Sequence, residues 1–110
     1  MNKRTRKALE ASIKHWKENR QAETPHQVSA YSDSCPLCEL FIYSRPPEDP
    51  CTGCPVMEKT GHRLCVHSPW KAASRALEAW RLLSTWRRAF RAACTREIKF
   101  LKSLREDDNA

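Results

Sequence analysis

Apolar residues near the N-terminus recur at steps of three and four, the spacing of an amphipathic helix. Leu9, Ile13 and Trp16 form one apolar stripe, and most positions around them are polar or charged. Pro25 ends the helix, because its ring removes a backbone N–H and clashes with the preceding turn. The pattern predicts a helix from about residue 4 to residue 23.

A second, longer amphipathic pattern fills the C-terminal part of the chain. Ser68 offers an N-cap hydroxyl, Pro69 suits the first helical position, and no Gly or Pro follows. A helix from residue 69 to about residue 106 would span roughly 50 Å or more, longer than so small a domain is wide. Either it breaks near Ser84 and Thr85, or its far half packs on another chain. We favour the unbroken helix with a homodimer or partner contact, because the apolar stripe is longer than the first helix can cover. The stripe comprises Trp70, Ala73, Leu77, Trp80, Leu83, Trp86, Phe90, Cys94, Ile98, Leu101 and Leu104.

The residues between the two patterns show little periodicity and contain five of the six cysteines. Residues 40–43 suit a helical turn or short strand that ends at Pro46 and Pro47. Residues 55–60 suit a short helix that Gly61 closes. We predict one folded, mainly α unit in three parts: an N-terminal amphipathic helix (1–24), a small zinc-stapled cysteine module (25–68) and a long basic amphipathic helix (69–110).

Two C-x2-C pairs give the module its chemistry. Cys35 with Cys38 and Cys51 with Cys54 are separated by twelve residues, which lets two tight turns converge on one tetrahedral ion. Thiolates are soft ligands that suit Zn²⁺. Because the module is too poor in apolar residues to form its own core, we expect the metal to supply folding free energy. The prediction is one structural Zn²⁺.

Cys65 makes five candidate ligands for four positions. Cys35 and Cys38 are the safest pair, and Cys51, Cys54 and Cys65 compete for the other two places, unless two metals bind. An iron–sulfur cluster is the runner-up cofactor, since a proline follows one of these cysteines as in some ferredoxins, although the ferredoxin spacing is not reproduced.

Three other residues with reactive side chains have simpler roles. His62 and His67 suit loop or surface positions, because enough thiols are already present. Cys94 lies on the apolar stripe of the second helix, where a buried thiol acts as a small hydrophobe. We expect Cys94 in the core.

The N-terminus lacks the features of an exported protein. It is basic, but the apolar run of roughly 7–15 residues that a secretory signal needs does not follow. No stretch approaches the roughly 20 apolar residues of a membrane-spanning helix. We therefore expect a reducing cytoplasm, where metal binding is favoured over disulfides.

Positive charge lies outside the cysteine module. The net charge is +4 over residues 1–24 and +5 over residues 70–110, against −2 for residues 25–69.

Four thiolates close a zinc shell and leave no open position for hydrolysis. No P-loop, dinucleotide fingerprint, G-x-S-x-G elbow or H-E-x-x-H motif is present. We do not expect an enzyme.

An ordered set of short motifs runs between residues 8 and 69. It reads Ala8-Leu9, Ser12-Ile13, His15-Trp16, Cys35-x-Leu37-Cys38, Cys51-x-Gly53-Cys54-Pro55-Val56, Lys59-Thr60-Gly61 and Cys65. This set resembles small cysteine-rich proteins encoded by tailed bacteriophages. The resemblance implies metal-binding cysteines and an accessory role in the host bacterial cytoplasm, without an assigned activity. The arginine-rich helix after Trp70 lies outside it.

Two functions remain open for the second helix. It can bind a host or phage protein with an acidic surface, because Trp and Arg dominate binding energy at interfaces and arginines steer association. Alternatively, its basic side chains can contact DNA or RNA phosphates, although five acidic residues in the same segment weaken that field. We favour the protein partner. The predicted contact residues are Trp80, Arg81, Trp86, Arg87, Arg88, Phe90 and Arg91.

Overall fold

Helices make up all the regular secondary structure in the described part of the chain. The computed structural model describes residues 1–30, 35–43, 53–62, 65 and 67–109, and no β-strand occurs among them. The predicted mainly α fold, with an N-terminal helix and a long C-terminal helix, is confirmed. The elements are α1 (Lys3–Arg20), η1 (Pro25–Gln27), α2 (Pro36–Cys38), η3 (Glu39–Tyr43), α3 (Pro55–Thr60), α4 (Trp70–Leu82), η4 (Ser84–Trp86) and α5 (Arg87–Asn109).

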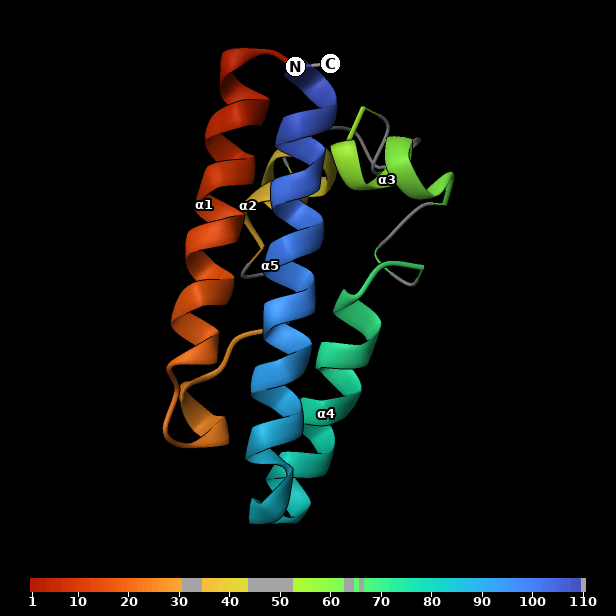
Figure 1. The fold of residues 1–110 in the computed structure, drawn as a ribbon. Helices are drawn as coiled ribbons and strands as arrows, with labels where there is room; N and C mark the ends of the chain where they lie inside the picture. Colours follow the sequence, from red (N-terminus) through yellow and green to blue (C-terminus); the bar gives the residue numbers. More distant parts are fainter. Residues whose placement is uncertain (31–34, 44–52, 63–64, 66, 110) are drawn as a thin grey trace.

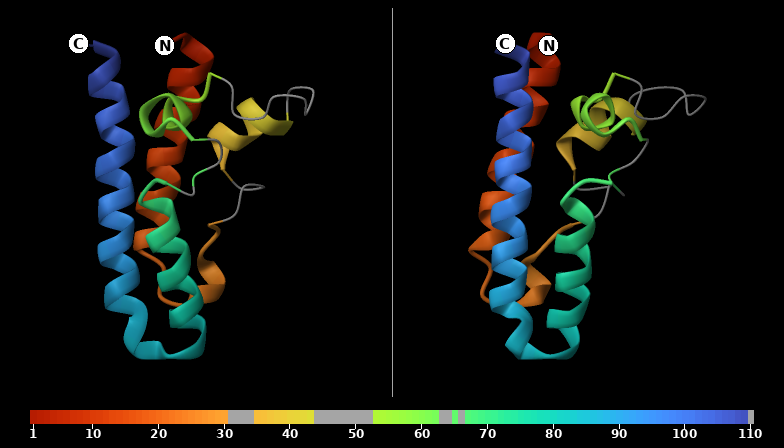
Figure 2. Two further views of the ribbon diagram at one scale, coloured as in Figure 1. Left: turned by 90° about the vertical axis from the view of Figure 1, so that its right-hand side faces the viewer. Right: turned by 45° about the vertical axis from the view of Figure 1, so that its right-hand side comes forward.

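The three long helices form a bundle in which α5 packs against both α1 and α4 (Figure 1). α1 and α4 run antiparallel to α5, so α1 begins and α5 ends at the same end of the bundle. The turn between α4 and α5 lies at the opposite end, whereas α2 and α3 lie beside the bundle toward the termini (Figure 2). The fold therefore separates α2 and α3, with their cysteines, from the α4–α5 turn.

α1 begins close to the position predicted from the sequence. The Asn2 side chain accepts a hydrogen bond from the Thr5 N–H at 2.8 Å, which satisfies one of the free donors at a helix start. Farther along, Arg105 of α5 donates to both carboxylate oxygens of Glu10, at 2.9 and 3.1 Å. This ion pair joins α1 to α5 near their common end.

Side chains of α1 also hold the segment that follows it. Asn19 Nδ2 donates to the Ser29 carbonyl at 2.9 Å, and the Ser29 N–H donates to Asn19 Oδ1 at 3.3 Å. His15 Nε2 lies 2.6 Å from the same carbonyl oxygen. Trp70 Nε1 donates to the Ala30 carbonyl at 2.6 Å. The start of α4 is thereby tied to the segment that α1 holds at Ser29.

The second amphipathic stretch is two helices, not one. α4 ends at Leu82, and Leu83 adopts an extended backbone with φ −136° and ψ 117° before the short η4 helix. The favoured prediction of an unbroken helix is wrong, and the alternative of a break near Ser84 and Thr85 is correct. No Gly or Pro marks the break in the sequence.

Packing explains why the chain folds back at this point. The molecule extends 40 Å along its longest axis, so a helix through the whole stretch would project beyond its partners. In the hairpin the ring of Trp80 stacks on that of Phe90, with centroids 5.4 Å apart. Apart from Leu83 and Trp86 at the turn, the apolar stripes of α4 and α5 are thus covered within one chain, which removes the reason for expecting a dimer through an unpaired long helix.

Three smaller predictions agree with the structure. α3 spans residues 55–60 and ends at Gly61, whose φ of 76° is the left-handed conformation that glycine adopts easily. Residues 40–43 are helical, the first of the two predicted options. Cys94 is fully buried, so its place in the core is confirmed. Among the described residues, no helix is both long and apolar enough to cross a membrane.

Candidate metal centre

Cys35 and Cys38 lie in a tight turn that opens the α2 helix. Cys35 is the N-cap residue, Pro36 follows at the first helical position, and Cys35 Sγ accepts a hydrogen bond from the Cys38 N–H at 3.4 Å. The Cys38 thiol also donates to the Cys35 sulfur, which lowers the pKa of Cys35 to about 6 and raises that of Cys38 far above its ordinary value. Of these two thiols, Cys35 is therefore the one that more readily becomes a thiolate.

Cys54 enters the same region from a similar local structure. It is the N-cap of α3, buried, and followed by Pro55, so both cysteine turns use a proline to start a helix. Cys65 comes from the segment that leads toward α4. After the larger effects of the Cys35 thiol and of burial, the charges of Cys65 and Cys54 also contribute to the raised pKa of Cys38.

One cavity of about 280 Å³ is lined by these four cysteines. We call Cys35, Cys38, Cys54 and Cys65 the cysteine quartet. In the described part of the chain, no three His, Cys, Asp or Glu side chains stand close enough together to ligate an ion. Metal binding would therefore require the four sulfurs to move closer. Cys51, the fifth predicted ligand, lies outside the described residues.

The remaining wall of the cavity is mostly apolar and aromatic. Trp16 of α1, Phe41 of η3 and Trp70 of α4 contribute to it, together with Leu101 of α5. Elements distant in the sequence therefore meet at this cavity. An ion held by the quartet would join α2, α3 and the segment before α4.

Two buried polar groups face the cavity, and the sequence did not single them out. Ser12 of α1 and Glu97 of α5 line it and are only 2% and 3% exposed. Glu97 Oε2 has no hydrogen-bond partner among the described residues, whereas the Ser12 hydroxyl faces the Cys35 thiol and helps to lower its pKa. Burial, with a smaller effect of the Cys35 charge, raises the pKa of Glu97 to about 8. The sequence offered one signal for Glu97: this carboxylate lies between Cys94 and Ile98, on the apolar stripe of its helix.

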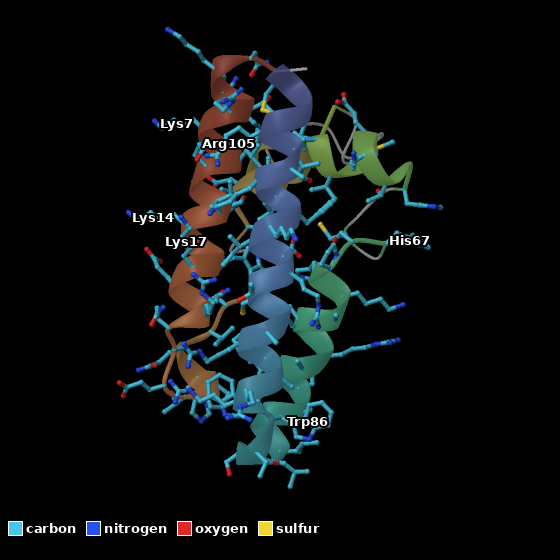
Figure 3. The ribbon with its side chains drawn as sticks, in the orientation of Figure 1. Lys7, Lys14, Lys17, His67, Trp86 and Arg105 are labelled. Carbon is cyan, nitrogen blue, oxygen red and sulfur yellow. The ribbon has the colours of Figure 1, made fainter. Side chains whose placement is uncertain are left out.

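The histidines take no direct part in the quartet. His62 and His67 are exposed, as predicted, and their rings stack on each other with centroids 3.7 Å apart. His67 projects away from the bundle (Figure 3). His15 lines the cavity, but its Nε2 already lies within hydrogen-bond distance of the Ser29 carbonyl.

The predicted partner-contact residues divide into buried and exposed groups. Trp80 and Phe90 are buried, and their rings stack on each other across the α4–α5 hairpin, so neither is exposed to a partner in this chain. Arg87 is half-buried and donates to the Ala22 carbonyl at 3.3 Å. Arg81 forms an ion pair with Glu78 at 2.7 Å.

The exposed apolar surface lies at the α4–α5 turn. Trp86 is 44% exposed, and its neighbours Leu82 and Leu83 are 85% and 60% exposed. We call these three residues the hairpin end; Figure 3 shows Trp86 beside the turn, far from the termini. Arg88 and Arg91 of α5 are also exposed. Sequence reasoning placed Leu83 in the buried stripe and did not include Leu82, because the fold-back could not be located.

No protein-family model, curated protein or solved structure matches the chain. Its function is therefore inferred from its own residues.

Proposed function

We propose that this chain is a non-enzymatic accessory protein, of the kind encoded by tailed bacteriophages, that binds a host or phage protein in the bacterial cytoplasm. In this proposal one structural Zn²⁺ stabilises the fold, and the hairpin end makes the partner contact. The observation that carries the binding role is the exposure of Leu82, Leu83 and Trp86 at one end of a bundle whose other apolar stripes are covered.

The chemistry of the cysteine quartet fits zinc. Four thiols in one mostly apolar cavity are soft donors in the number that a closed tetrahedral site needs. The lowered pKa of Cys35 favours the thiolate that a metal requires. Bound there, zinc would supply structural cross-linking only, because a closed shell leaves no position for a reacting water. Cys65 is preferred over Cys51 as the fourth ligand, since its sulfur lines the cavity.

The hairpin end has the composition of a protein-binding surface. Solvent-exposed Trp and Leu side chains that lie together are the usual anchors of an interface, with Trp among the residues that contribute most. Arg88 and Arg91 follow on the same end of α5 and would favour an acidic rim on the partner. Two copies of this chain meeting end to end would place these arginines near each other, so a different, acidic protein is the better occupant.

The binding proposal is tested by copurification from the natural bacterial host after nuclease treatment. Leu83→Glu and Trp86→Ala should each remove the bound protein, because they change exposed side chains at the contact. The matched control is Lys7→Ala with Lys14→Ala and Lys17→Ala, three exposed lysines on the outer side of α1, which should keep it (Figure 3). Retention of the same protein by both hairpin-end variants would refute the proposed surface.

Nucleic-acid binding is the second candidate, and the exposed lysines of α1 favour it. Lys7, Lys14 and Lys17 project from the outer side of the helix, where phosphates could reach them (Figure 3). In this case nuclease would remove the bound material. The triple lysine variant would lose salt-dependent retention on random duplex DNA, and the hairpin-end variants would keep it.

Metal analysis of protein purified under reducing conditions without chelator tests the zinc site. We expect one zinc per chain, lost when any member of the quartet is changed to serine and kept in Cys51→Ser. Loss of zinc in Cys51→Ser with retention of zinc in Cys65→Ser would show that Cys51, and not Cys65, is the fourth ligand. Iron with inorganic sulfide in equal amounts would establish the iron–sulfur alternative instead.

A further inference from the structure

Three lysines of α1 lie on the side of the helix that faces away from the bundle. Lys7, Lys14 and Lys17 are exposed, and their spacings of seven and three place them on one face of the helix. Figure 3 shows all three side chains projecting outward together. None of them forms a side-chain ion pair or hydrogen bond with another residue in the described part of the chain. Their charges are therefore available to a partner.

The acid that lies among these lysines is neutralised by α5. Glu10 is the only acidic residue between Lys7 and Lys17, and it shares their face of α1. Arg105 of α5 donates to both of its carboxylate oxygens, at 2.9 and 3.1 Å. Because the two charges of this ion pair cancel, Glu10 does not interrupt the positive surface.

α5 adds a further cation beside α1. Arg20 of α1 donates to the Thr95 hydroxyl at 3.3 Å, so this side of α5 borders α1. Lys102 lies about two turns beyond Thr95 on the same side of the helix. We call Lys7, Lys14, Lys17 and Lys102 the basic face. Lys7 and Lys17 are about 15 Å apart along the helix axis, and each strand of a duplex presents about four phosphates over that length.

The basic face lacks the side chains that other partners would need. The large apolar residues of α1 are buried, so this surface offers neither the apolar centre of a protein interface nor the apolar side of a membrane-surface helix. Single-stranded nucleic acid is held by stacking of its bases on exposed aromatic rings. Trp16, the only Trp, Phe or Tyr of α1, is buried. The phosphates of a duplex need charge alone.

We propose that the basic face binds the phosphate backbone of duplex nucleic acid without reading its sequence, while the hairpin end remains accessible to a protein. Trp86 of the hairpin end and Lys7 of the basic face lie toward opposite ends of the bundle (Figure 3). The chain would then link a protein to a duplex. This role goes beyond the protein contact proposed above and depends neither on that contact nor on the zinc site.

The test is the binding of wild-type protein to a fluorescent DNA duplex of random sequence, followed by anisotropy over a range of salt concentrations. Four phosphate contacts predict a slope of about −3.6 in log affinity against log salt concentration. Lys7→Ala with Lys14→Ala should reduce the size of this slope by about 1.8. The charge-matched control is Lys71→Ala with Arg75→Ala, which removes two exposed cations of α4 and should keep the wild-type slope.

A second variant should strengthen binding. Glu10→Gln releases the Arg105 guanidinium from its ion pair and adds one cation beside the lysines, so affinity for the duplex should rise and the slope should steepen by about 0.9. Glu78→Gln is the matched control, because Glu78 is paired with Arg81 on α4, which α5 separates from α1 (Figure 1). It should bind the duplex as the wild type does. Circular dichroism checks that each variant stays folded.

The outcomes separate this inference from the protein contact. Equal losses in the lysine variant and its α4 control would show that net charge alone acts and would overturn the basic face. Unchanged affinity in Glu10→Gln, or tighter binding of a single strand than of the duplex, would also overturn it. Each of these results leaves the hairpin end standing, because its partner is identified after nuclease treatment. Loss of duplex binding in Trp86→Ala would overturn the separation of the two surfaces.

Discussion

Removing the metal should unfold the cysteine module and leave the three-helix bundle in place. The part of the module from α2 to α3 has few large apolar side chains to hold it: Leu37, Phe41 and Val56 are its buried ones in the described residues. At about 1.5–3 kcal/mol each, their burial contributes about 5–9 kcal/mol in total. Structural zinc sites contribute apparent binding free energies of about 10–16 kcal/mol. A zinc ion at the proposed site would therefore contribute more than these apolar contacts to the ordering of this segment.

The bundle keeps its own core without the ion. Leu9 of α1, Leu77 of α4 and Phe90 of α5 are each at most 1% exposed. α2, η3 and α3 contribute three, five and six helical residues, 14 in all, against 54 in α1, α4 and α5. Chelation should thus lower the helical circular-dichroism signal by about a fifth.

Hydrogen exchange read by mass spectrometry locates the change. With chelator and reductant, amides of α2 and α3 should exchange as in an unfolded peptide, while those in the middle of α1 and α5 stay protected. Adding Zn²⁺ should restore the protection. Unchanged protection of α2 and α3 in protein shown to be free of metal would refute the reasoning, because the apolar contacts would then suffice.

Three further predictions concern residues outside the metal site. Trp80→Ala should lower the free energy of unfolding by about 3–5 kcal/mol in a denaturant titration, because it removes a buried ring stacked on Phe90. The control Trp86→Ala should change this free energy by less than about 1 kcal/mol, and equal effects of the two variants would contradict the assigned burial. Asn19→Ala should cost about 1–3 kcal/mol by leaving the Ser29 N–H without its acceptor, and the exposed Gln21→Ala is its control. Burial raises the pKa of Cys94 to about 12. Iodoacetamide at pH 8 should therefore leave Cys94 unmodified in the native protein and alkylate it in denaturant. Rapid labelling of the native protein would show that this thiol lies at the surface.

Periodicity predicted the helices well because local spacing sets which face of a helix is apolar. The stripe of Leu9, Ile13 and Trp16 located α1, and Gly61 located the end of α3. The break at Leu83 could not be found this way, since neither Gly nor Pro marks it. It follows from packing between α4 and α5, which local sequence does not encode.

The sequence predicted the kind of site, a cluster of thiols, but not which cysteines belong to it. The C-x2-C spacing indicated thiols gathered at one place, and Cys35, Cys38, Cys54 and Cys65 do line one cavity. Cys51 lies outside the described residues, so the choice among Cys51, Cys54 and Cys65 stays a prediction. Glu97 was overlooked because a carboxylate in a charge-rich helix counts as a surface residue until its face of the helix is known.

The apolar character of the hairpin end is not required by the turn itself. Turn positions usually carry Gly, Asn, Asp or Ser, whose backbones and side chains favour the reversal. Leu82 is 85% exposed, and the extended backbone of Leu83 is open to any residue, so polar side chains would allow the same fold-back. Exposed leucines beside an exposed tryptophan also add a risk of aggregation. Folding therefore gains little from these side chains, whereas a contact with another protein would make use of all three.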